Sequence, residues 1–211
     1  MKDNKKTLKV LSVTWLVLYL FNFCCSFFIN IINGVPLKYM SGAYLLKSLY
    51  FIASIVVIVL CAFGYAQSKG RKGLKITAVV LPLITVLYNS ATGIFAPLVK
   101  NIFKINYYYI TDFLSLAVSL LGVAALTFAL LYLFKAFKDS KALIALVSVY
   151  YGFSLCLSWF YNIRSLWNIV LYGGMQDAFF NAFICFVNMI IAVISTATWI
   201  IFTKKIIINE S

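Results

Sequence analysis

Histidine is absent from this sequence, and acidic residues are scarce. The 211 residues include five Asp and Glu against 18 Lys and Arg, which gives a net charge of +13. Most enzymes that act inside a membrane need a carboxylate, a histidine, a metal ion or an activated nucleophile. The acids stand at or beyond the ends of the apolar runs: Asp3, Asp112, Asp139, Asp177 and Glu210. We therefore expect no enzymatic activity, no cofactor and no metal site.

Cysteine is also uninformative as a site residue. All five cysteines lie inside apolar runs, and no two of them form a C-x-x-C pair: Cys24, Cys25, Cys61, Cys156 and Cys185. An odd number of cysteines in such places is typical of small apolar side chains in packed helices. The sequence predicts neither a disulfide framework nor a zinc site.

Charge of either sign is rare compared with apolar residues. The chain is 64% hydrophobic and 11% charged, and its mean hydropathy is +1.00. Soluble domains are about 45–50% apolar and about 25% charged, so a soluble fold could not cover this much apolar surface. The basic residues stand in small clusters at the ends of apolar runs, a pattern of topology signals and lipid contacts. We expect a lipid bilayer as the environment and no nucleic acid as a partner.

Apolar runs of membrane-spanning length follow one another along the whole chain. A bilayer core of about 30 Å needs about 20 residues of helix. We predict an all-α, polytopic membrane protein with one domain over residues 1–211. Its six expected spans are residues 8–33, 45–67, 75–99, 112–135, 142–163 and 178–203.

The basic residues also predict an orientation. With the N-terminus in the cytoplasm, five of the 18 Lys and Arg fall on the outer side: Lys38, Lys47, Lys100, Lys104 and Arg164. The other 13 fall inside, as the positive-inside rule requires. Both termini are therefore expected in the cytoplasm. The richness in Lys, Ile, Asn and Phe favours the plasma membrane of a bacterium.

Polar residues recur on one side of several spans. On the first span they share an arc of about 80°: Ser12, Trp15, Tyr19, Asn22, Ser26, Asn30 and Asn33. The fifth and sixth spans carry similar stripes, and the third a weaker one containing Thr77, Thr85, Tyr88 and Thr92. Such stripes either join helices by hydrogen bonds or line a polar cavity. The sequence leaves both interpretations open.

A face of small residues marks the fourth span. Ser115, Ser119, Gly122 and Ala125 recur at three- and four-residue steps. Small side chains let another helix approach closely. This face is a candidate contact with a second membrane protein, or a packing face inside the bundle.

The segment after the fifth span joins two helices with polar stripes. Over residues 161–172, polar side chains fall on one arc and apolar side chains on the opposite one, as in an interfacial helix. We predict a short interfacial helix here, either an aromatic anchor or a lid over an outward-facing cavity. The candidate ligand-binding residues are Asn30, Asn33, Trp159, Asn162, Arg164, Trp167, Asn168 and Asn181.

Two classes of function remain. The first is a small-solute binding or transport subunit for an uncharged, aromatic or anionic ligand, with no energy coupling of its own. In size and span count the chain is similar to the substrate-binding subunits of energy-coupling-factor vitamin transporters, but the regularly spaced alanines of their first helix are missing. The second class is a membrane accessory, immunity or regulatory protein that acts through helix–helix contacts.

Overall fold

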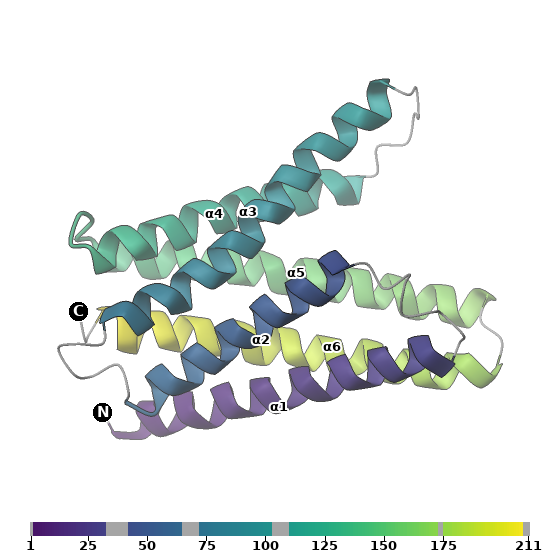
Figure 1. Cartoon of the computed structure of the whole chain (residues 1–211), viewed down its shortest axis with the longest axis horizontal. Helices are drawn as coiled ribbons and strands as arrows, with labels where there is room; N and C mark the ends of the chain where they lie inside the picture. Colours follow the sequence, from purple (N-terminus) through teal and green to yellow (C-terminus); the bar gives the residue numbers. More distant parts are fainter. Residues whose placement is uncertain (1, 33–41, 65–71, 103–109, 173–174, 209–211) are drawn as a thin grey trace.

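The computed structural model describes residues 2–32, 42–64, 72–102, 110–172 and 175–208 (Figure 1). Helices account for almost all of these residues, as expected where a backbone must satisfy its own hydrogen bonds in hydrocarbon. The elements are α1 (Lys2–Ile32), α2 (Gly42–Ala62), α3 (Lys72–Ile102), α4 (Ile110–Leu133), α5 (Ser140–Tyr172), α6 (Met175–Phe202) and the short π-helix η2 (Thr203–Ile208). The predicted all-α fold is confirmed.

Five of the helices are long and apolar enough to cross a membrane. Their apolar stretches within the described residues are Lys6–Cys25, Lys72–Ala91, Phe113–Leu133, Ser140–Leu171 and Phe179–Ile208. The corresponding stretch of α2, Ser48–Ala62, is shorter. A membrane protein built of apolar helices is thus supported, while the number of six spans and the orientation stay predictions.

α5 is longer than a bilayer is thick. It runs without interruption from Ser140 to Tyr172, 33 residues, which corresponds to about 50 Å at 1.5 Å per residue. The segment expected to form a separate interfacial helix is the last part of this one helix. A distinct helix between α5 and α6 is therefore not confirmed.

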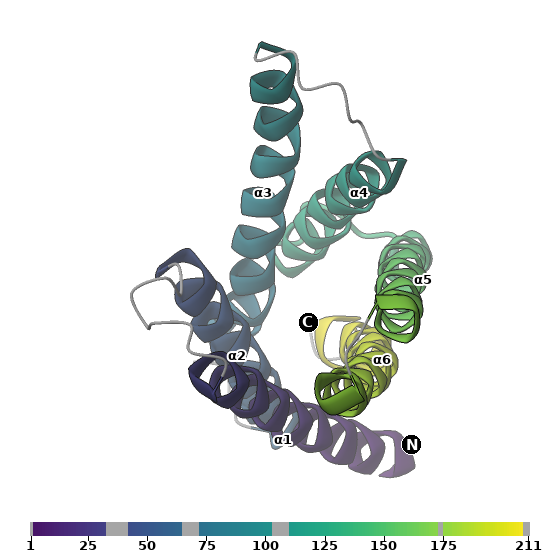
Figure 2. The ribbon, with the colours of Figure 1, turned by 90° about the vertical axis from the view of Figure 1, so that its right-hand side faces the viewer.

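The six α-helices follow one another around a ring in chain order. Each helix packs against the next, and α6 packs against α1, which closes the ring (Figure 2). Consecutive helices run in opposite directions, so the start of α1 and the end of α6 lie at one end of the bundle (Figure 1). We call this the termini end and the opposite one the far end. The η2 segment contacts α4, α5 and α6 at the termini end.

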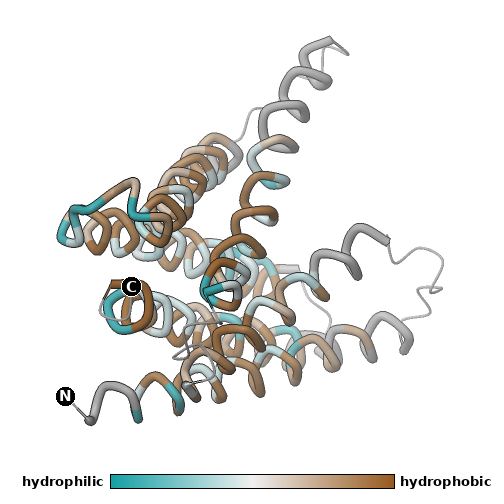
Figure 3. The backbone as a smooth tube through the Cα atoms, turned by 60° about the vertical axis from the view of Figure 1, so that its left-hand side comes forward, coloured by the Kyte–Doolittle hydropathy of each residue, from teal (hydrophilic) through white to brown (hydrophobic). Residues whose placement is uncertain are grey.

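Most of the side chains that the structure describes as buried lie toward the termini end. On α5 the buried side chains are Leu143, Val147, Tyr150 and Tyr151, and no described residue of α5 beyond Tyr151 is buried. The far end of α3 lies apart from α1, α5 and α6 (Figures 1 and 2). Hydrophilic residues gather at both termini and at the connection between α4 and α5 (Figure 3). The described buried side chains thus pack the termini end of the bundle.

α2 and α4 both finish at the termini end, and each is followed by a residue with a positive φ. Gly64 follows α2 with φ 90°, and Lys135 follows α4 with φ 63°. After α4, the N–H of Ala136 donates to Leu131 O at 2.9 Å and the N–H of Lys135 to Tyr132 O at 3.0 Å. This is a Schellman motif, in which glycine is the usual residue because other side chains cost about 1–2 kcal/mol there.

The small-residue face of α4 is used inside the bundle. Gly122 and Ala125 are buried, and a Cβ on Gly122 would lie 2.5 Å from Cε2 of Tyr150 on α5. Ser115 and Ser119 are half-buried. Gly122 thus packs against α5 of the same chain, and Ala125 is buried within the bundle. A second protein on this face stays a prediction.

Enlarging Gly122 should destabilise the bundle. We expect Gly122→Leu to lower the free energy of unfolding by about 1–3 kcal/mol, because the new side chain overlaps the buried Tyr150 ring. Gly152→Ala is the matched control, since nothing lies within 4 Å of a Cβ at that position. Thermal unfolding of the detergent-solubilised protein measures both. Equal melting temperatures for Gly122→Leu and the wild type would show that Tyr150 moves aside freely.

Candidate functional site

The polar stripe of α1 faces the inside of the ring. Ser12 and Trp15 are buried at 0% and 1% exposure, whereas Val10 and Val17, on other sides of the helix, are each 58% exposed. Tyr19 and Asn22 are half-buried and continue the stripe toward the far end. Because polar groups are costly in contact with lipid, this rotation of α1 is the favourable one.

One hydrogen bond joins this stripe to the stripe on α6. Asn22 Nδ2 donates to Asn188 Oδ1 at 3.0 Å, across 166 positions in the sequence. Such interhelical bonds contribute about 0.6–2 kcal/mol in membrane proteins. For this pair, the interpretation of the stripes as a means of joining helices is correct.

The same stripe also contains buried polar atoms without a partner. Among the described residues, Trp15 Nε1 and Asn22 Oδ1 are buried and make no hydrogen bond. The first is a donor and the second an acceptor, and their separation of seven residues corresponds to about 10 Å along the helix axis. Leaving a buried polar group unpaired costs about 1–3 kcal/mol. Native structures contain few unpaired buried polar groups, and each one needs an explanation.

Aromatic side chains surround this part of α1. The Phe51 ring of α2 meets Trp15 edge-on at 5.8 Å between centroids and lies 4.7 Å from the Tyr19 ring. Nearer the termini end, Tyr151 of α5 stacks on Trp199 of α6 at 5.2 Å and 14°. Aromatic surface from α2 thus lies beside Trp15, and no acidic or basic residue stands between Lys9 and Lys38 in the sequence.

The predicted ligand-binding residues of α5 and α6 have a different setting. Trp159 Nε1 donates to Met189 O on α6 at 3.3 Å, and Asn162 Nδ2 donates to Ser158 O on its own helix at 2.7 Å. The side chains of this group on the outside of the bundle are Trp159, Arg164, Trp167, Asn168 and Asn181. Exposure fits both lipid contact and the rim of an opening, so their role stays a prediction.

The structure does not describe the side chains of two of the predicted ligand-binding residues. Asn33 lies outside the described residues, and so does the side chain of Asn30. The weaker stripe expected on the third span is not directed into the ring at two of its positions, because Thr77 and Tyr88 of α3 are exposed. Thr77 Oγ1 donates to Gly73 O on its own helix at 2.9 Å.

Metal-binding side chains do not cluster in the part of the chain that the structure describes. No group of three His, Cys, Asp or Glu residues there could hold a metal ion. The sequence pattern located the stripe on α1 but could not identify its unpaired atoms. Which polar group lacks a partner depends on the neighbouring helices, and the sequence carries no signal for it.

Comparison with known proteins gives no match: no protein-family model, no curated protein and no solved structure is similar to this chain. The functional argument therefore depends on the site itself.

The Asn22–Asn188 bond can be measured by a double-mutant cycle. We expect Asn22→Ala and Asn188→Ala each to destabilise the protein, and the double variant to lose less than the sum. The coupling free energy should be about 0.6–2 kcal/mol, the range of interhelical hydrogen bonds in membranes. Ser158→Ala with Asn162→Ala is a control pair within one helix. Additive losses in the Asn22–Asn188 cycle would contradict the bond.

Proposed function

We propose that the chain is a multi-pass protein of a bacterial plasma membrane that binds a small solute inside the ring of helices. The observation that carries the proposal is the pair of buried, unpaired atoms on α1, Trp15 Nε1 and Asn22 Oδ1. A bound solute that accepts a hydrogen bond from Trp15 and donates one to Asn22 would satisfy both. Ligand pockets are typically apolar with a few such fixed polar groups.

The residues around these two atoms indicate which kind of solute could bind to them. Phe51 and Tyr19 offer aromatic surface beside Trp15. No acidic or basic residue of α1 lies between Lys9 and Cys25, so a charged solute would be bound without a counter-ion from this helix. Burial of an unpaired charge costs far more than burial of a neutral polar group. An uncharged, planar solute with one donor and one acceptor, of the nucleobase or cyclic-amide class, fits best.

The asymmetry of the bundle suggests the direction of access. The termini end is filled by buried side chains, whereas α5 has no described buried residue beyond Tyr151. A solute would thus enter from the far end, which the positive-inside rule places outside the cell. There the predicted residues Trp159, Asn162, Arg164, Trp167, Asn168 and Asn181, with Asn30 and Asn33, would form the entrance. The chain supplies binding or passive passage, and any energy would come from a partner.

The alternative, an accessory protein that acts through α4, has less support. Two of the four residues of its small-residue face, Gly122 and Ala125, pack within the chain. The solute-binding role is therefore the proposal that we develop.

A solute screen with a variant of Trp15 tests the proposal. We expect one or more uncharged nucleobases, vitamins or amides to raise the melting temperature of the detergent-solubilised protein. Trp15→Phe should weaken binding of that solute about three- to tenfold, the value of one hydrogen bond of about 0.5–1.5 kcal/mol. Trp199→Phe is the matched control, since it removes the same volume from another buried tryptophan.

Two outcomes would count against the proposal. One is a broad panel of solutes that gives no thermal shift with the wild-type protein. The other is a solute whose affinity falls equally in Trp15→Phe and Trp199→Phe, because the loss would then come from packing and not from the indole N–H.

Arg164→Ala separates the entrance from the interior site. Arg164 is exposed on α5, and substitutions of exposed residues usually change stability by less than about 0.5 kcal/mol. We expect an unchanged melting temperature and slower association of the solute, measured by stopped-flow quenching of tryptophan fluorescence. An unchanged association rate would exclude Arg164 from the entrance.

A further inference from the structure

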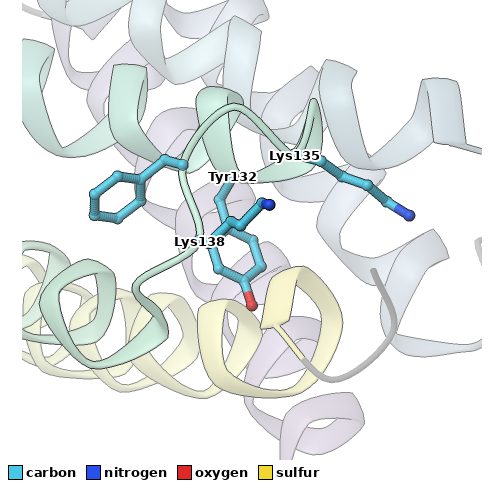
Figure 4. Close-up of a pocket in the computed structure, with 4 residues that line it drawn as sticks. Tyr132, Lys135 and Lys138 are labelled. Atoms are coloured by element: carbon cyan, nitrogen blue, oxygen red, sulfur yellow. The ribbon is translucent and has the colours of Figure 1, made fainter.

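The connection between α4 and α5 forms a second candidate site, at the termini end. A pocket of about 250 Å³ is lined there by Tyr132, Lys135, Phe137 and Lys138 (Figure 4). The sequence pattern uses these lysines as orientation signals and as general lipid contacts. In the structure two of them line one pocket together with Tyr132.

Local hydrogen bonds and ring contacts fix the backbone of this connection. The N–H groups of Ala136 and Phe137 both donate to Leu131 O, at 2.9 and 3.2 Å. The Phe137 ring meets Phe128 of α4 edge-on at 5.0 Å. A pocket on such a connection is preformed, so a ligand would bind without first ordering a loop.

Positive charge concentrates around the pocket. Lys135 and Lys138 belong to its lining. On α3, Lys72 Nζ lies 5.2 Å from the centre of the ring of Phe134, the residue before Lys135 in the chain. The acidic residue of the connection is Asp139. Its Oδ1 accepts hydrogen bonds from the backbone N–H groups of Lys141 and Ala142, both at 3.0 Å, and so caps α5. The pocket is therefore suited to an anion.

The backbone at Lys135 supports a functional role for this lysine. Its φ of 63° is the conformation that Gly64 adopts at the end of α2. A lysine in that conformation is strained, and strained residues gather at binding sites. The sequence thus places a cation where glycine is the relaxed choice.

The surroundings of the pocket determine which anion fits. The helix that leads into it is apolar, and its Leu131 and Phe134 are exposed at 38% and 57%. Tyrosine and lysine at the end of an apolar helix lie at the depth of lipid headgroups. A ligand there meets cations at the pocket and apolar side chains along α4, which matches a phosphate group that carries acyl chains.

We propose that this pocket binds the headgroup phosphate of an anionic phospholipid. The Tyr132 side chain points from α4 toward the C-terminal segment, and Lys135 extends to the other side of the connection (Figure 4). The long, flexible stems of Lys135 and Lys138 bring their ammonium groups to the phosphate. The acyl chains lie along Leu131 and Phe134. This site is separate from the interior solute site on α1.

Native mass spectrometry of the detergent-solubilised full chain tests the proposal, with phosphatidylglycerol and phosphatidylcholine as probes. The wild type should bind phosphatidylglycerol in preference to phosphatidylcholine. Lys135→Gln with Lys138→Gln should weaken phosphatidylglycerol binding at least tenfold, at about fivefold for each lysine near a membrane surface. Binding of phosphatidylcholine should be unchanged.

Matched variants separate the pocket from general surface charge. Lys6→Gln with Lys204→Gln removes the same charge from exposed positions on α1 and η2 that do not line the pocket, and it should weaken phosphatidylglycerol binding clearly less than the pocket pair does. Lys135→Gly should raise the melting temperature in detergent, because glycine relaxes the backbone, and still weaken phosphatidylglycerol binding. The second result cannot come from a loss of folding.

Two results would overturn the proposal. An equal loss of phosphatidylglycerol binding in the Lys6/Lys204 variant would assign the effect to the charge of the whole termini end. Stabilisation by inorganic phosphate alone, with no further effect of phosphatidylglycerol, would make the ligand a soluble phosphate and not a lipid.

Discussion

The contact between α1 and α6 closes the ring of helices, and the orientation of the interior depends on it. Lipid is as apolar as the helix surfaces, so helices associate through close packing and hydrogen bonds and not through the hydrophobic effect. The bond from Asn22 Nδ2 to Asn188 Oδ1 fixes the rotation of α1 against α6. On the same helix Trp15 is buried, and Asn22 Oδ1 has no donor. One of the two unpaired atoms thus belongs to the residue that joins α1 to α6.

Packing differs between the two ends of the bundle, and this difference separates the two candidate sites. At the termini end, Gly122 lets the Tyr150 ring approach α4, and Tyr151 stacks on Trp199. Beyond Tyr151, α5 has no described buried residue. The buried side chains at the termini end are consistent with the proposed access to the interior from the far end. The lysines gather at the closed end, where an anion can be bound without entering the hydrocarbon.

The helices could be predicted from the sequence, whereas their contacts could not. The span expected at 112–135 is α4 at Ile110–Leu133, because the length of an apolar run and its lysine borders are local signals. The inward stripe of α1 follows from the 100° period. The Asn22–Asn188 bond joins residues 166 positions apart, and no local pattern selects the partner. The expected end at 135 lies two residues beyond the end of α4, where Lys135 occupies the position in which glycine usually marks a helix end.

Charged residues are kept out of the middle of the spans, and this limits which ligands each part of the protein can bind. Acidic and basic residues stand at or beyond the ends of the expected spans, since a charge at the bilayer centre costs several kcal/mol. An interior site built from an indole N–H and an amide oxygen can recognise a neutral solute by direction and spacing alone. An anion finds its counter-charges only at the ends of the helices, as at Lys135 and Lys138. The proposed neutral solute in the interior and the proposed anionic lipid at the rim are both consistent with this restriction.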